Sequence, residues 1–343
     1  MKKCLKCLFR LTFLQILYGV GIVWGLGSCK NDDYEKLTGK AQGTTYAITF
    51  KKSDSKISKN EVDSIFKVID RSMSLWDSTS TITAFNKTEA KMEVDGHFQK
   101  VLQKSFEIHQ QSEGVFDPTV GPLIKAWGFI NKGSLPIPND ASIDSLKRFV
   151  GLEKIKLIGN IVSKTYAGIQ LDFNAIAQGY TVDVLAEFLE NKKVQDYLIE
   201  VGGEVRTKGF NSENKSWKVG IEKPTLNETD ETNALQTVLN LNNISLATSG
   251  NYRNYIENKG KKFGHIINPK TGKAVEHQVV SVSVLAGTCA EADAWATAFT
   301  VMGKEKSMLF AKKLGFEIQI ISWQKDSNNF EVFQSEGFKK TIQ

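Results

Sequence analysis

The segment that constrains the fold most lies near the C-terminus, at residues 290–302. It reads AEADAWATAFTVM, in which apolar side chains occupy nearly every side of a helix. Alanine is the strongest helix former, and a helix that is apolar all round has to be buried. The rest of the chain must therefore supply the elements that cover this helix. A composition of 41% hydrophobic and 24% charged residues is typical of a globular protein with such a core.

One carboxylate interrupts this apolar segment. Asp293 lies four residues before Thr297, so a helix places both side chains on one face. A carboxylate in apolar surroundings needs a cation or a hydrogen-bond donor, and two oxygen ligands on one helix face suit Mg²⁺. The alternative is a structural aspartate that bonds to neighbouring backbone or pairs with a lysine. The segment alone leaves both interpretations open.

The rest of the chain mixes predicted strands and helices without strict alternation, which favours an α+β fold over a doubly wound sheet. The predicted strands are residues 44–50, 155–158, 161–166, 169–173, 197–201, 217–221, 235–241, 244–248, 279–285, 316–323 and 330–333. The predicted helices are residues 61–76, 98–112, 142–150, 174–191 with Asn174 as N-cap, 290–302 and 304–314. We expect the strands between 217 and 248 to continue the sheet that 197–201 begins, with a polar loop at 224–232.

The first thirty residues predict export. Four basic residues within the first ten precede an apolar run at residues 11–26, which is the order of a secretory signal peptide. The run is shorter than the about 20 apolar residues that span a bilayer. It ends in Leu-Gly-Ser before Cys29, which resembles the bacterial lipobox. We therefore expect a signal peptide at residues 1–28, a lipid on Cys29 and a polar tether at residues 29–39; an uncleaved signal anchor is the alternative.

Cysteine usage and charge agree with an exported globular protein. Cys4 and Cys7 lie inside the predicted signal peptide and Cys29 would be lipidated, so Cys289 alone remains. A mature chain of roughly 310 residues buries a full core without a disulfide. Removing the four basic residues of the signal lowers the net charge from +6 to +2 (6 − 4 = 2). No basic run interleaved with aromatic residues indicates nucleic-acid binding.

Two segments have turns that are suited to binding a ligand. At residues 171–180 a predicted strand ends in Asp172 and a helix begins with small residues, and the N–H groups of a helix N-terminus favour a phosphate. At residues 265–272 His265 precedes a turn that Asn-Pro begins and Thr-Gly closes. Each has an ordinary alternative: a capped strand-to-helix turn in the first, and a structural histidine in the second.

Aromatic side chains occur in two further segments. Trp76 closes a Met-Ser-Leu-Trp sequence, and Phe116 lies in the Gly- and Pro-rich residues 114–122. The two rings either line a slot for a planar ligand or belong to the core. A last segment, Gln-Gly-Thr-Thr-Tyr at residues 42–46, places a glycine and two hydroxyls before a strand. None of these segments is specific by itself.

Their order along the chain resembles the ApbE family, the FAD:protein FMN transferases. In succession the chain contains Gly-Thr-Thr-Tyr, Met-Ser-x-aromatic, Phe-Asp-Pro-Thr-Val-Gly-Pro-Leu with Trp-Gly-Phe, Asp-Phe-x-Ala-Ile-Ala-x-Gly-Tyr, Val-Gly-Gly-Glu, Thr-Ser-Gly-x-Tyr, His-Ile-Ile-x-Pro-x-Thr-Gly and Ala-Asp-Ala-x-Ala-Thr-Ala. Eight ordered motifs are far more specific than one. The resemblance implies a single mixed α/β catalytic domain at residues 40–343.

The resemblance also implies an activity. Members of the family cleave FAD at its pyrophosphate, attach FMN by a phosphodiester to a Thr or Ser hydroxyl of a target protein, and release AMP. Their targets are exported or membrane-bound flavoproteins, such as subunits of Na⁺-translocating NADH:quinone reductase or Rnf-type complexes. With a lipid on Cys29, the enzyme is expected in the cell envelope, at the periplasmic face of the inner membrane. The alternatives are an FAD pyrophosphatase that gives FMN and AMP, and a flavin-binding lipoprotein without catalysis.

The site residues that the resemblance implies are transferred position by position. Mg²⁺, with Mn²⁺ as an alternative, would bind Asp293, Thr297 and the backbone oxygen of Ala175. His265 is the first candidate for the base that activates the acceptor hydroxyl, and Asp293 is the second. The residues that would contact FAD, the substrate, are Gln42, Trp76, Val115, Phe116, Asp117, Asp172, Gln178 and Ile267.

Three positions depart from the usual pattern of the family. Gln178 stands where the family usually has lysine, Gln42 where methionine is common, and Asn268 where an aspartate is often found. Glutamine donates a hydrogen bond but brings no charge, so we expect these changes to affect the affinity for FAD rather than the reaction.

Overall fold

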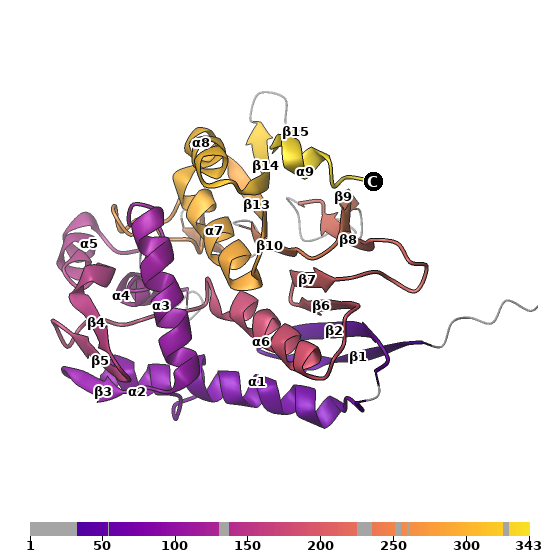
Figure 1. Ribbon diagram of the computed structural model, residues 1–343. Coiled ribbons are helices and arrows are strands. Elements are labelled where there is room, and N and C mark those ends of the chain that lie inside the picture. The colour runs from indigo at the N-terminus through magenta and orange to yellow at the C-terminus, as the bar shows by residue number, and fades with distance from the viewer. Residues whose placement is uncertain are drawn as a thin grey trace, which may run out of the picture. The chain divides into compact units, whose positions relative to one another are not determined.

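The computed structural model describes residues 33–53, 55–129, 137–224, 235–250, 255–258, 261–324 and 329–343. The predicted signal peptide, Cys29 and residues 29–32 of the predicted tether lie outside the described residues, as do residues 225–232 of the predicted loop. Residues 33–343 form one compact unit (Figure 1). None of the helices in the described ranges has both the length and the hydrophobicity that crossing a bilayer requires.

Eight of the described strands form one large sheet in which every neighbouring pair is antiparallel. In sheet order they are β1 (Tyr34–Ala41), β2 (Thr44–Lys51), β6 (Tyr197–Val201), β7 (Glu204–Lys208), β10 (Ser245–Gly250), β13 (Val279–Ala286), β14 (Glu317–Gln324) and β15 (Asn329–Gln334). Every residue of β13 is buried. Other elements must therefore cover both faces of the sheet at its centre.

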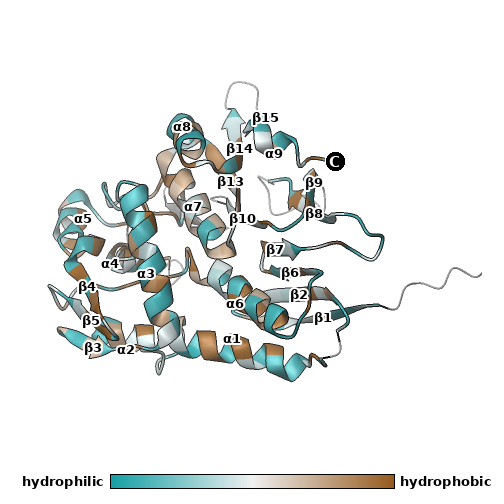
Figure 2. Cartoon of the chain, in the orientation of Figure 1, coloured by the Kyte–Doolittle hydropathy of each residue, from teal (hydrophilic) through white to brown (hydrophobic). Residues whose placement is uncertain are grey.

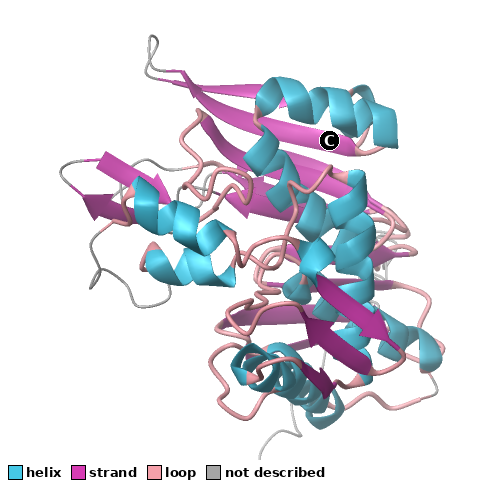
Figure 3. Cartoon of the chain, turned by 90° about the vertical axis from the view of Figure 1, so that its left-hand side faces the viewer, coloured by secondary structure: helices cyan, strands magenta, loops and turns pink. Residues whose placement is uncertain are grey.

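Three helices cover one face of the sheet. They are α6 (Ala177–Asn191), α7 (Cys289–Met302) and α8 (Lys304–Leu314), and Figure 3 shows strands of the large sheet behind this helical layer. Helix α7 lies against β10 and β13, while α6 lies against β6 and β7. Eleven of the fourteen α7 residues are buried, which confirms the central helix expected from its composition. In Figure 2 this helix shows little of the strong polar colouring seen on α3.

A short hairpin covers the opposite face. Strands β8 (Trp217–Glu222) and β9 (Leu235–Leu241) form a separate two-stranded sheet. Together with α9 (Glu336–Lys339) they bury an apolar cluster against the large sheet, made of Val205, Val219, Ile221, Leu239, Leu241, Leu246, Leu285 and Phe338. The prediction that 217–221 and 235–241 continue the main sheet was therefore wrong, whereas 244–248 does belong to it as β10.

Several of the remaining described elements pack around the outer side of α7 and share its hydrophobic cluster, which includes Phe85, Phe98 and Trp295. They are α1 (Lys59–Met73), α2 (Thr81–Lys87), α3 (Gly96–Gln111), a 3₁₀ turn (Leu152–Lys154), and the sheet β3 (Lys91–Glu93), β5 (Ile161–Lys164) and β4 (Ile155–Ile158). A separate cluster around Leu123, Trp127 and Ile143 joins α4 (Gly121–Ala126), α5 (Asp140–Lys147) and the hairpin β11 (Tyr255–Asn258) and β12 (Lys261–Gly264). The mixture of helices with antiparallel sheets confirms the α+β fold class.

Two predicted boundaries are corrected by the structure. Residues 34–39, predicted as tether, belong to β1, whose full length pairs with β2. Residues 169–173, predicted as a strand, form only an isolated bridge at Gln170. The backbone of Leu171 is bonded instead to the side chain of Asn86, through both its N–H and its carbonyl, so it cannot join a ladder.

The start of α6 also differs from the prediction. The N-cap is Ile176 rather than Asn174, and the Ile176 side chain has no group that could bond the free N–H groups. Asn174 lies in a preceding turn, where its N–H donates to Asp172 at 2.8 Å. Helix α6 therefore begins without a side-chain cap of its own, and this matters for the site.

Candidate functional site

Asp293 lies in the first half of α7 and is buried, with 8% of its surface exposed. Its Oδ2 accepts a hydrogen bond from the Gly179 N–H of α6 at 3.0 Å. Burial, with a smaller contribution from nearby Asp183, raises the pKa of Asp293 to about 7. The carboxylate is therefore poised between its neutral and ionised forms at neutral pH. A cation beside it would favour the ionised form.

The first turns of α6 and α7 meet at Gly179. A Cβ atom at this position would clash with the Cys289 carbonyl and lie 2.8 Å from the Asp293 Cβ. Only glycine allows the two helices to approach this closely. The approach brings the Gly179 N–H in the first turn of α6 to the Asp293 carboxylate, which supplies a side-chain cap that Ile176 does not provide.

The other two predicted metal ligands flank this junction. Thr297 follows Asp293 by one turn of α7 and is half-buried, and Ala175 lies in the turn before α6, packed against the cluster that contains α7. Among the described residues, no group of three or more His, Cys, Asp or Glu side chains is placed to hold a metal ion. A cation here would be bound by one carboxylate, one hydroxyl and one carbonyl. Such an all-oxygen set fits Mg²⁺ and does not fit a structural zinc site.

The loop at residues 115–119 contributes buried groups that bond to each other and to neighbouring segments of the protein. Asp117 accepts hydrogen bonds from the Thr119 N–H at 2.8 Å and from the Leu152 N–H at 3.1 Å, and burial raises the pKa of its carboxyl group. Phe116, 3% exposed, belongs to the main core. Val115 is buried against Ile266. For the Phe116 ring the structure thus favours the core alternative, while the contact of Asp117 with FAD stays a prediction.

Asp172 is buried, although its carboxylate accepts only one hydrogen bond from the described residues. Its side chain accepts the Asn174 N–H, and burial raises its pKa to about 6. The Asp172 N–H donates to the Pro118 carbonyl at 2.7 Å, which fixes the segment before α6 against the loop at residues 115–119. Asp172 is therefore held by the backbone, while its carboxylate has accepting capacity left for a ligand.

The turn after β12 has the predicted form. The Asn268 carbonyl accepts the Gly272 N–H at 2.8 Å, and the Asn268 side chain accepts the Lys270 N–H at 2.9 Å. Ile267 is buried against Leu123 and Trp127. His265 lies between β12 and this turn and is half-buried.

Two glutamines lie beside the first turns of α6. The Gln178 Nε2 donates to the Val201 carbonyl at 2.8 Å, and the Gln42 Nε2 donates to the Thr181 hydroxyl at 3.1 Å. Gln42 sits in the tight turn between β1 and β2 with φ of 51°. Both amides are thus engaged with protein groups. In contrast, Trp76 follows α1 with 76% of its surface exposed, so of the two alternatives for this ring the structure excludes the core.

Contacts link most of the predicted segments into one region. Asp172 bonds the loop at residues 115–119, Val115 packs on Ile266, and the Lys270 side chain approaches Gly114. Trp76 follows α1 and is not part of these contacts. Sequence reasoning missed one group at the junction, Asp183, which lies within the apolar part of α6 and binds the first turn of α7. A carboxylate among Val182, Val184 and Leu185 was the available signal.

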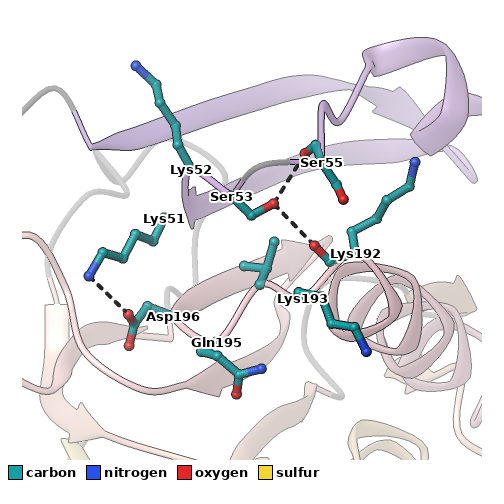
Figure 4. A pocket seen from close by; sticks show the side chains of 9 residues that line it. Lys51, Lys52, Ser53, Ser55, Lys192, Lys193, Gln195 and Asp196 are labelled. Carbon is teal, nitrogen blue, oxygen red and sulfur yellow. Dashed lines mark hydrogen bonds and ion pairs between the residues drawn. The ribbon is translucent and has the colours of Figure 1, made fainter.

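Two surface depressions of the described chain lie elsewhere. One of about 440 Å³ (Figure 4) is lined by Lys51, Lys52, Ser53, Ser55, Lys192, Lys193, Val194, Gln195 and Asp196. Another, of about 510 Å³, lies between β9, β15 and the C-terminus. Neither is lined by a predicted site residue. Lys51 already pairs with Asp196, and in Figure 4 the four lysine side chains point in different directions, so they do not converge on a ligand.

Comparison with known proteins agrees with the geometry. The ApbE family model matches residues 42–321. The FAD:protein FMN transferase of Haemophilus influenzae is 34% identical over 94% of this chain and 96% of its own length. That of Escherichia coli K12 is 33% identical over 89% of this chain and 88% of its own length.

Solved structures agree as well. The flavin transferase ApbE from Vibrio cholerae superposes with a TM-score of 0.80 at 30% identity, covering 90% of this chain and 99% of its own. The flavinyl transferase ApbE from Pseudomonas stutzeri, in its apo form, gives a TM-score of 0.81 at 28% identity, covering 90% and 96%. With the sequence match spanning the junction of α6 and α7, the chain belongs to the ApbE family.

Proposed function

We propose that this protein is a Mg²⁺-dependent FAD:protein FMN transferase, which releases AMP and leaves FMN on a Thr or Ser of its target. The observation that carries the proposal is the buried Asp293 at the meeting point of two helix N-termini. A buried carboxylate with a raised pKa costs stability, and such groups gather at functional sites. The names of its relatives, FAD:protein FMN transferases, supply the reaction.

The proposed cation site uses Asp293, Thr297 and the Ala175 carbonyl. When bound, Mg²⁺ would neutralise pyrophosphate charge and stabilise the phosphate of the leaving AMP. The start of α6 adds the positive end of a helix dipole on the same side.

The transfer needs little covalent chemistry from the protein. The acceptor hydroxyl oxygen forms a bond to the phosphorus of the FMN half, and the bond from that phosphorus to the bridging oxygen breaks. AMP leaves with the bridging oxygen, and the hydroxyl proton passes to a base. We assign that base to His265, because an Asp293 carboxylate engaged with a cation is the weaker base.

The residues around the flavin would orient it. Exposed Trp76 offers a face for ring stacking. Gln178 donates to the Val201 carbonyl, so its amide oxygen is the part left for FAD. A lysine at this position would bring a positive charge, whereas the Gln178 amide offers FAD a neutral oxygen.

The proposed setting is the cell envelope. Lipid attachment at Cys29 would place the domain where exported and membrane-bound flavoproteins are modified, such as subunits of Na⁺-translocating NADH:quinone reductase or Rnf-type complexes. The described domain begins at Asp33, so three residues, or four Cα-to-Cα steps, separate it from Cys29. That length reaches at most about 14 Å when extended, which would keep the catalytic domain close to the membrane.

Mass spectrometry of an acceptor tests the reaction. An acceptor bearing a Ser/Thr-Gly-Ala-Thr/Ser sequence is incubated with the protein and FAD, with Mg²⁺ or with a chelator. We expect a mass gain of one FMN phosphodiester on a single hydroxyl residue, only with Mg²⁺. Free FMN and AMP without acceptor modification would instead identify a pyrophosphatase, and intact bound FAD would identify a flavin-binding protein.

A further inference from the structure

Helices α6 and α7 cap each other. The Asp293 carboxylate on α7 accepts the Gly179 N–H in the first turn of α6. In return, the Asp183 carboxylate on α6 accepts the N–H groups of Cys289 and Ala290 in the first turn of α7, each at 2.9 Å. Each helix thus supplies the acceptor for N–H groups that the other leaves unbonded.

The first turn of α7 depends on this exchange. Its own N-cap, Thr288, accepts only the Glu291 N–H, at 3.3 Å. The N–H groups of Cys289 and Ala290 are bonded by Asp183 alone, through one carboxylate oxygen each. Asp183 therefore holds α7 at both of its first two residues, and this fixes where Asp293, one turn later, lies relative to α6.

Arg206 holds Asp183 in turn. It reaches across from β7 and pairs with the Asp183 Oδ1. Asp183 is largely buried, and a buried carboxylate needs such a partner to remain ionised and oriented. The chain of contacts runs from β7 through Arg206 and Asp183 to the start of α7.

We infer that Asp183, held by Arg206, is a positioning residue that sets the Asp293 carboxylate for cation binding. The inference rests on the proposed function, because it concerns the proposed Mg²⁺ site. Asp183 does not itself touch the reacting atoms. It fixes the helix that carries the ligand, and its negative charge beside Asp293 favours a cation there.

Mn²⁺ binding to the metal-free protein tests the inference without use of the enzymatic activity. Free Mn²⁺ is followed by electron paramagnetic resonance for the wild type and for Asp183→Asn, which keeps the shape but loses the charge and one acceptor. We expect Asp183→Asn to bind Mn²⁺ about tenfold more weakly or worse. Its half-saturating Mg²⁺ concentration in flavin transfer should rise by a similar factor.

Asp95→Asn is the matched control. Asp95 is half-buried and accepts the N–H groups of His97 and Phe98 in the first turn of α3, at 2.9 and 3.0 Å. None of its bonded partners is a predicted site residue. We expect this variant to lose thermal stability as Asp183→Asn does, but to bind Mn²⁺ like the wild type.

The outcomes are distinct. If Asp183→Asn binds Mn²⁺ as tightly as the wild type and loses only thermal stability, the positioning role is wrong and Asp183 is purely structural. If the wild type itself binds no Mn²⁺, the proposed metal site fails instead. Should Asp183→Asn not fold, Asp183→Asn with Arg206→Met removes both charges of the pair, which avoids an unpaired buried arginine. The same weakening is expected in that double variant.

Discussion

The two faces of the large sheet bury different chemistry. On the helix-covered face lie the Asp183–Arg206 pair and the Asp293 carboxylate. On the hairpin-covered face lies an apolar cluster, with a neutral hydrogen bond from Thr237 to Gln319 beside it. Strand β7 shows the contrast within two residues, since Arg206 reaches α6 and Val205 packs toward the hairpin. At the junction of α6 and α7, the buried carboxylates accept N–H groups from the two helix N-termini.

This contrast separates stability from function. The apolar face contributes free energy by burying hydrophobic area and requires no particular geometry of polar atoms. The helix-covered face holds buried carboxylates in fixed positions, and their burial costs folding free energy. Such groups are typical of a functional site rather than of a structural core.

Loss of the Asp293 carboxylate has the largest expected effect. Asp293→Ala removes the only carboxylate among the three proposed cation ligands. We expect the rate of flavin transfer to fall by at least about 100-fold, since outer-shell changes alone cost 10- to 100-fold. Initial rates of acceptor labelling, with the melting temperature as a check on folding, measure the effect. A variant that labels at the wild-type rate would remove Asp293 from the mechanism.

Widening the junction of α6 and α7 should have the next largest effect. In Gly179→Ala the new Cβ meets the Cys289 carbonyl and the Asp293 side chain, so the helices must move apart. We expect about 1–3 kcal/mol lower stability and transfer slowed about tenfold or more, since small misplacements are costly.

Gly96→Ala is the control for that substitution. Gly96 opens α3, and a Cβ there meets nothing within 4 Å. Alanine in a helix should leave transfer unchanged and stability equal or up to about 1 kcal/mol higher. Equal effects of the two substitutions would show that the close approach at Gly179 has no special role.

The increase in melting temperature that Mg²⁺ produces should depend on pH, and this effect should be smaller than those of the substitutions above. Burial raises the pKa of Asp293 from 3.8 to about 7, so the folded protein binds this proton more tightly than the unfolded chain. The stability that this proton on Asp293 gives the folded protein is therefore fully present below pH 3.8 and is lost as pH rises through about 7. Mg²⁺ pairs with the ionised form, so its effect on the melting temperature should grow between pH 6 and 8.

The variant Asp293→Asn separates the effect of Asp293 ionisation from that of Asp172, whose pKa burial also raises, to about 6. In the variant, the rise of Mg²⁺ stabilisation with pH should flatten. Differential scanning fluorimetry at matched ionic strength measures it. An unchanged pH profile in Asp293→Asn would place the titrating group elsewhere.

A cavity on the apolar face should have the smallest effect on transfer. Leu239 on β9 is fully buried in the hairpin cluster, so Leu239→Ala should cost about 2–5 kcal/mol of stability. Below its lowered melting temperature we expect the wild-type turnover and the wild-type Mg²⁺ requirement. A changed Mg²⁺ requirement would contradict the separation between the two faces.

Local patterns predicted the elements that are long and regular. The helix at residues 304–314 and the strands at 197–201 and 235–241 have the bounds expected from the sequence. Their apolar spacing is strong and their ends carry clear stop residues. Strand β7 was not predicted, although Glu204–Lys208 alternates polar with β-branched residues as a half-buried strand does.

Contacts between distant segments could not be predicted in the same way. Asp293 was singled out because a carboxylate in an apolar helix is anomalous whatever surrounds it. The bonds from Asp183 to Cys289 and Ala290 join residues over 100 positions apart, and no local pattern signals them. The strand expected at 169–173 failed for a related reason, since Asn86 takes its backbone bonds from 85 residues away.

Anomalous diffraction from crystals soaked with Mn²⁺ and FAD tests the central claim most directly. We expect one strong anomalous peak at the junction of α6 and α7, in contact with the Asp293 carboxylate, the Thr297 hydroxyl and the Ala175 carbonyl, with the FAD pyrophosphate beside it. A peak bound by other residues, or FAD bound with no metal at the junction, would contradict it.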